Sequence, residues 1–130
     1  MSENKEILEN GIVKISDDVV TIIAGIATME VDGVHSMHTG IVEGFSNLFT
    51  KNNYSKGVKV EINENNVVLD IFIIVTYGCK INKVAAEIQK NVKKEIETMT
   101  DLNVTVVNIH VQNIITEKTE KIEKTEKIEK

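Results

Sequence analysis

Three histidines are the side chains of this sequence that suggest metal binding. His35 and His38 form a closely spaced pair, and His110 lies far downstream. Two histidines three residues apart on a strand point to opposite faces, so they cannot share one metal ion unless the strand bends. His110 joins one of them only if the fold happens to bring it near. We therefore predict no metal site and no bound cofactor.

The single cysteine, Cys79, is the one strong candidate nucleophile. It follows Gly78 at an expected strand-to-helix junction, where a helix N-terminus favours a thiolate. Its one adjacent cation is Lys80, and no histidine stands near it in the sequence to act as a base. We interpret Cys79 as a structural residue. A lone cysteine forms no internal disulfide, which favours a reducing cytoplasm.

Other motifs with catalytic chemistry are absent from the sequence. The segment GIVEG (40–44) lacks the lysine and hydroxyl residue of a phosphate loop and the spacing of a dinucleotide fingerprint. Asp17 and Asp18 are explained by the N-terminal end of a helix, whose dipole favours acidic side chains. We therefore predict no catalytic residues and a protein that is not an enzyme.

Composition excludes two further classes. All 15 basic residues are lysines, and the formal net charge is −5. An acidic chain without arginine is a poor nucleic-acid ligand, because arginine makes the bidentate phosphate and base contacts. No run reaches the roughly 18–20 apolar residues of a bilayer span, and the N-terminus has no apolar signal segment. We expect a cytoplasmic protein without a membrane span of its own.

Hydrophobic periodicity predicts the elements that hold these residues. Segment 67–77 is apolar on both faces, which is typical of a central strand. Segment 82–99 is an amphipathic helix, with Lys93 and Glu97 among the residues expected to face away from the core. The predicted strands are 11–15, 34–37, 58–63, 67–77 and 103–113, and the predicted helices are 17–30 and 82–99.

The order β-α-β-loop-β-β-α-β predicts an α+β fold. We expect a two-layer sandwich in which both helices cover one face of a mixed sheet of about 4–5 strands. In the last strand, alternation places Thr105, Val107, Ile109 and Val111 on one face. Short strands leave the strand order open.

Composition divides the chain into three parts. Residues 1–10 form an N-terminal extension, and residues 11–115 form one domain. Residues 116–130 repeat the triplets TEK and IEK and carry five Glu and five Lys, so this tail is locally neutral. It has no continuous apolar stripe to bury, and we predict a solvated, frayed helix or a disordered spacer, with docking to a partner as the alternative.

The first predicted helix is more apolar than a surface helix needs. Ser16 fits its N-cap, and apolar side chains occur on more than one face. Such a helix is buried on two sides or packs against another subunit. We predict a subunit contact formed by Ile22, Ile23, Ala24, Gly25 and Ile26, in which the small Ala24–Gly25 pair lets another backbone approach.

The segment 39–57 is long for a loop without periodic structure, which indicates a functional or mobile segment. It holds Phe45, Leu48 and Phe49 among glycine and polar residues. These side chains either fold back as a lid on the core or form an exposed apolar patch for a partner or a second copy.

An ordered series of segments resembles the alkaline shock and general-stress proteins of Gram-positive bacteria, the envelope stress response family. The resemblance runs from Gly11 to Ile114 and includes Ile81 and Val92. The segments are GIVKIS (11–16), IIAGIA (22–27), EVDGV (30–34), GVKV (57–60), VTYG (75–78), VAAEIQ (84–89), TDLNV (100–104) and VNIHV (107–111).

The resemblance implies a small non-enzymatic protein without cofactors. It implies self-association into a homo-oligomer and attachment to the inner face of the membrane through a separate integral-membrane partner. We expect an interaction or scaffold protein of the envelope stress response. The alternative is a small-ligand-binding module with the segment 39–57 as its mobile lid.

Overall fold

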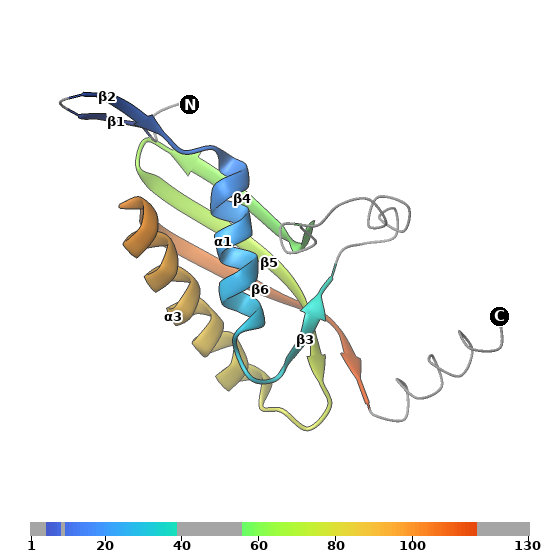
Figure 1. Ribbon diagram of the computed structural model, residues 1–130. Helices are drawn as coiled ribbons and strands as arrows, with labels where there is room; N and C mark the ends of the chain where they lie inside the picture. The colour runs from blue at the N-terminus through green and yellow to red at the C-terminus, as the bar shows by residue number, and fades with distance from the viewer. Residues whose placement is uncertain (1–4, 9, 39–55, 117–130) are drawn as a thin grey trace, which may run out of the picture.

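The computed structural model describes residues 5–8, 10–38 and 56–116, and shows a two-layer α+β domain in which two helices cover one face of a mixed sheet (Figure 1). The predicted fold class is confirmed. The strands are β1 (Lys5–Leu8), β2 (Gly11–Lys14), β3 (Val34–Met37), β4 (Val58–Asn63), β5 (Asn66–Thr76) and β6 (Asn103–Ile115), and the helices are α1 (Asp17–Met29) and α3 (Ile81–Thr100).

Strand β5 is the centre of the four-stranded sheet, as its apolar sequence predicts. β4 pairs antiparallel with residues 66–71 of β5, and β3 pairs antiparallel with residues 73–75. β6 runs parallel to β5 along residues 66–76. Because β6 occupies one whole side of β5, β3 and β4 share the other side. β6 is therefore an edge strand, with no second strand beside it among the described residues.

The core forms where alternate side chains of β5 meet the helices. Leu69, Ile71 and Ile73 have no exposed surface, and the residues between them are half-buried on the other face of the sheet. α3 contributes one buried residue per turn at the spacing expected of an amphipathic helix. The buried helix side chains of the same core cluster include Val20, Ala24 and Ala27 from α1 and Val84, Ile88, Val92 and Ile96 from α3.

Two details of the N-terminal region go beyond the sequence prediction. The expected strand at 11–15 is β2, but it pairs antiparallel with β1 in a separate two-stranded sheet that the sequence did not reveal. Ser16 occupies the N-cap position of α1, as predicted, although its hydroxyl makes no capping hydrogen bond.

The predicted face of the last strand is wrong at one residue. The register between β5 and β6 shifts between Val67 and Val68, where the β6 partners step from Val104 to Val106. The extra residue, Thr105, forms a bulge, and its hydroxyl donates a hydrogen bond to the Val67 carbonyl at 3.1 Å. Val104 consequently lies in the core at 3% exposure while Thr105 is exposed.

Candidate functional site

Helix α1 presents two apolar faces. One face is buried in the domain and includes Ala24, Gly25 and Ile23, the last of which is 8% exposed. The other face leaves Val19 and Ile26 each 42% exposed. Of the residues predicted to form a subunit contact, Ala24 and Gly25 thus lie inside the domain. The part that another molecule can reach is the face around Ile26.

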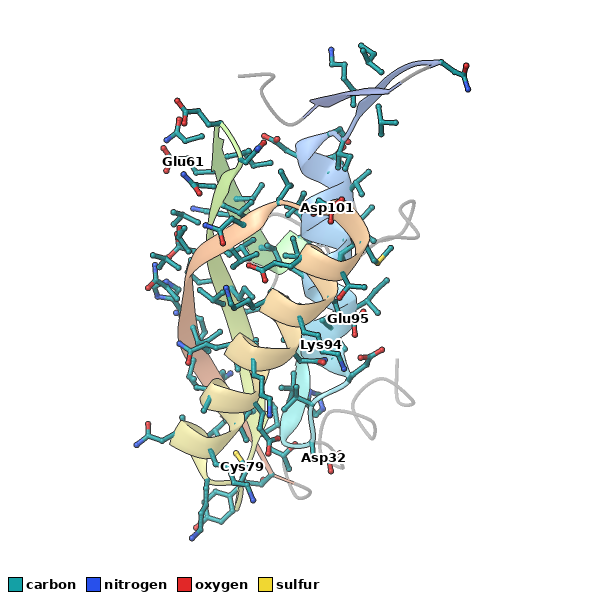
Figure 2. All side chains as sticks on the ribbon, turned by 90° about the vertical axis from the view of Figure 1, so that its left-hand side faces the viewer. Asp32, Glu61, Cys79, Lys94, Glu95 and Asp101 are labelled. Carbon is teal, nitrogen blue, oxygen red and sulfur yellow. The ribbon has the colours of Figure 1, made fainter. Side chains whose placement is uncertain are left out.

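This second face of α1 forms one wall of an apolar groove against α3. The groove has a volume of about 320 Å³. On its α3 side Met99 is 64% exposed, and Glu95 projects from α3 toward α1 in Figure 2. The lining residues are Val19, Ile22, Ile23, Ile26, Ala27, Glu30, Glu95 and Met99. We call this surface the α1–α3 groove. Its floor is apolar, and two carboxylates stand at its rim.

The opposite face of the sheet carries a cluster of polar and aromatic side chains. The His110 Nε2 and Asp70 Oδ1 atoms lie 2.9 Å apart, and the His110 ring stacks on Phe72 with centroids 4.4 Å apart. The Lys59 ammonium lies 5.6 Å from the Phe72 ring centroid, and Asn108 donates to Asp70 Oδ1 at 3.1 Å. The hydrogen bond with His110 lowers the pKa of Asp70. Partial burial raises this pKa, whereas the hydrogen bond from Asn108 and the charges of His110 and Lys59 lower it further.

A third feature is a row of α3 side chains along the free edge of β6. Gln89 Nε2 donates to the Val107 carbonyl at 3.0 Å, and Lys93 Nζ donates to the Val104 carbonyl at 3.0 Å. Glu97 Oε2 accepts the Val104 N–H at 2.9 Å and pairs with Lys93 at 2.9 Å. Hydrogen bonds from Lys93 and then from the Val104 N–H lower the pKa of Glu97.

Lys93 and Glu97 lie outside the core, as predicted, but they make contacts with β6 that the sequence did not reveal. Both are partly exposed, but their polar ends turn to the backbone of β6 instead of facing away from the domain. A long polar side chain next to a strand edge can hydrogen-bond to the unpaired peptide groups of that strand. Helix periodicity alone does not show that such an edge is near.

The structure separates the residues that the sequence singled out for chemistry. His35 lies in β3 and His38 just after it, on one side of β5, whereas His110 lies in β6 on the other side of β5, beside Asp70. Within the described ranges, no group of three or more His, Cys, Asp or Glu side chains could hold a metal ion. Cys79 is half-buried beside Gly33. Phe45, Leu48 and Phe49 lie outside the described residues, as does most of segment 39–57 and of the tail.

The Asp70–His110 pair is the polar feature that sequence reasoning missed. The two residues are separated by 40 positions, and only the parallel pairing of β5 with β6 brings them together. The available signal was the polar Asp70 within an otherwise apolar strand, since a charged group in such a strand needs a partner on a neighbouring strand.

Comparison with known protein families shows which family this chain matches. The model of the alkaline shock protein 23 family, which is described by a cell envelope-related function, matches residues 5–116, a range that includes every residue that the structure describes. The chain belongs to the alkaline shock protein family. The resemblance to envelope stress proteins that the sequence segments indicated is thereby confirmed.

Individual relatives in this family come from Bacillus and Streptococcus. The uncharacterized protein YqhY of Bacillus subtilis (strain 168) is 40% identical over 104 residues, which cover 80% of this chain and 77% of that protein. A stress response regulator gls24 homolog of Streptococcus pyogenes serotype M3 is 32% identical over 106 residues, covering 78% of this chain and 58% of the relative. Among solved structures, MamM CTD aligns with a TM-score of 0.44 at 14% identity over 73% of this chain and 93% of that one.

In the described part of the chain, neither α1 nor α3 combines the length with the apolar character that a spanning helix needs.

Proposed function

We propose that this alkaline shock family protein is a non-enzymatic, self-associating interaction protein of the envelope stress response. It acts by assembling with copies of itself, and the α1–α3 groove is one surface of that assembly. We further propose that it lies in the cytoplasm, at or near the inner face of the membrane, where an integral-membrane protein anchors it. The family description, a cell envelope-related function, supports this location.

The exposed apolar wall of the groove is the observation that supports self-association. Full burial of a valine, isoleucine or methionine side chain stabilises by about 1.5–3 kcal/mol. Val19 and Ile26 are 42% exposed and Met99 is 64% exposed. A partner that buries the exposed part of each side chain therefore gains about half of this stabilisation per residue. Together they offer roughly 3 kcal/mol per copy, or about 6 kcal/mol in a symmetric contact.

This magnitude also limits what the groove does alone. Association costs about 4–15 kcal/mol in lost translational and rotational freedom. A groove-to-groove contact worth about 6 kcal/mol meets only the lower part of that cost. The groove therefore supports a weak contact, and a stable assembly needs a second surface.

The chemistry of the described residues supports a role without catalysis. Asp70 and His110 form an acid–histidine pair, but both side chains are well exposed, whereas ligand sites usually enclose most of the ligand. Cys79 stands beside Gly33 and Val84, and its half-buried side chain packs against the turn that follows α1.

Light scattering after size-exclusion chromatography tests the role of the groove. We compare the full chain with Ile26→Lys, which puts a charge on the exposed wall, and with Thr98→Lys, which adds the same charge at an exposed position of α3 outside the groove lining. We expect concentration-dependent assembly in wild type and in Thr98→Lys, and weaker assembly in Ile26→Lys. Equal assembly of all three proteins rules out the groove as a contact.

An apolar ligand in the same groove is the second candidate function. The volume of about 320 Å³ falls at the lower end of the range for small-molecule sites, about 300–1,000 Å³. In that case segment 39–57 acts as the lid. Hydrogen exchange with added fatty acid or phospholipid separates ligand binding from self-association. If the protein stays monomeric and the added lipid protects α1 from exchange, and if Ile26→Lys abolishes that protection, the result favours ligand binding.

A further inference from the structure

Strand β6 is an edge strand without the usual protection against pairing. Its 13 residues, NVTVVNIHVQNII, include no lysine, arginine, aspartate, glutamate or proline. Natural edge strands usually carry charges or proline that prevent another strand from adding to them. Val106, Val111 and Ile114 of this strand are 41%, 36% and 42% exposed. The edge is therefore competent to bind another strand wherever its backbone groups are free.

The α3 side chains that hydrogen-bond to this edge reach only the first half of β6. Glu97, Lys93 and Gln89 follow one another at intervals of four residues and reach the backbone of Val104 and Val107. The next residue in the same row, four positions before Gln89, is Ala85. A methyl group cannot hydrogen-bond to a strand, so this cover ends at the level of Val107.

The uncovered stretch contains Ile109 and Val111. Peptide groups alternate in direction along a strand. Since the Val107 carbonyl points away from β5 to Gln89, those of Ile109 and Val111 point away as well. Farther along, the Asn113 side chain accepts the Ile114 N–H at 2.8 Å. No described residue hydrogen-bonds to the outward N–H and C=O groups of Ile109 and Val111.

We propose that this stretch pairs antiparallel with the same stretch of a second copy, around a two-fold axis at His110. In that register Ile109 of one copy stands opposite Val111 of the other, and each such pair exchanges two hydrogen bonds. Four hydrogen bonds form, and the open donors and acceptors of both copies are used. This inference rests on the self-association proposed above, although on a different surface.

Two properties of the edge fit a second copy. The stretch is complementary to itself, since the two outward residues flank one central position symmetrically. The chain carries a net charge of −5, so two copies repel, and an uncharged strand lets them approach where this repulsion is weakest. Val111 and Ile114 of this edge are 36% and 42% exposed, so the added strand also covers apolar surface.

Cysteine cross-linking tests the register. The two His110 residues form the non-hydrogen-bonded pair at the axis, with Cα atoms about 4.5 Å apart, which is within the range of a disulfide. Two Asn108 residues are offset by four positions, or about 13 Å along the strands. In a Cys79→Ser background we expect His110→Cys to form an intermolecular disulfide rapidly and Asn108→Cys, on the same outer face, to form almost none.

Extension of the α3 row tests the surface without touching β6. Ala85→Lys places a long cationic side chain in the row at the level of the open stretch, whereas Ala86→Lys adds the same charge on the exposed side of α3. We expect Ala85→Lys to weaken association at least about tenfold and Ala86→Lys to leave it near wild type. Urea unfolding of both variants checks that each is folded, and if Ala85→Lys is not, the cysteine pair decides.

The outcomes separate this inference from the proposed function. Selective cross-linking of His110→Cys together with weaker association of Ala85→Lys supports the pairing. Association of wild type combined with equal cross-linking of the two cysteine variants overturns the pairing and leaves self-association standing. A wild-type chain that stays monomeric at every concentration overturns both.

Discussion

Gly33 and Gly78 have nearly the same backbone conformation in different surroundings. Their φ angles are +101° and +103°, a region that residues with a side chain rarely adopt. A Cβ atom added at Gly33 would lie 2.6 Å from Val84 Cγ2 and 3.3 Å from Cys79 Cβ, whereas one added at Gly78 meets nothing within 4 Å. Alanine at the two positions therefore separates backbone strain from packing.

The size of each effect follows from this geometry. Strain from the positive φ costs about 1–3 kcal/mol at either glycine. At Gly33 the added methyl group also pushes Val84, which is buried in the first turns of α3, and such overpacking costs a further 1–3 kcal/mol or so. We expect Gly78→Ala to lower the free energy of unfolding by about 1–3 kcal/mol and Gly33→Ala by about 2–6 kcal/mol.

Urea denaturation monitored by circular dichroism measures both values. The change that alanine makes to the unfolded chain is common to the two variants and cancels in their difference. That difference of about 1–3 kcal/mol corresponds to a gap of roughly 1 M in the urea midpoint. Equal losses in the two variants would refute the close packing of Gly33 against Val84.

Two further predictions concern β5. Leu69 is fully buried, so Leu69→Ala should lower the free energy of unfolding by about 2–5 kcal/mol in the same urea assay, and a loss below about 1 kcal/mol would contradict its central place in the core. The hydrogen bond with His110 lowers the pKa of Asp70, so the ionised carboxylate stabilises the fold above the unfolded-state pKa of 3.8, and this contribution is lost as the pH falls through the lower folded-state pKa. Because the pair is well exposed, Asp70→Asn should cost only about 0.5 kcal/mol at pH 6 and nothing at pH 2, and a difference that persists at pH 2 would contradict this assignment.

Local patterns predicted most of the fold. The alternation in β5 and the four-residue spacing of Val84, Ile88, Val92 and Ile96 in α3 are set by burial on one face of a single element, which a sequence displays directly. The sequence did not reveal the N-terminal hairpin, because β1 reads KEIL, two charged residues followed by two apolar ones, and so shows no alternation.

What the sequence did not reveal depends on contacts between distant segments. The bulge at Thr105 is a property of the β5–β6 pairing and not of either strand alone. The same holds for the hydrogen bonds from Gln89 and Lys93 to the backbone of β6, and for the pairing of Asp70 with His110. A parallel strand pair joined through a helix leaves no local signature of its register, so the candidate surfaces emerge only in three dimensions.

The predicted subunit contact on the first helix combines residues from two faces of α1. Ile23, Ala24 and Gly25 are buried in the domain, whereas Ile26 is 42% exposed. The sequence did not show that Ala24 and Gly25 belong to the face that packs inside the domain. Helical periodicity defines which residues share a face, but the face that meets the sheet is chosen by tertiary packing.

The mass of the full chain in solution tests the central claim most directly. Light scattering over a wide dilution series reports the average mass at each concentration without a label or a partner. Self-association predicts a mass that rises from 14.5 kDa in dilute solution to at least twice that value as the concentration increases. A constant mass of 14.5 kDa over the whole series would contradict it.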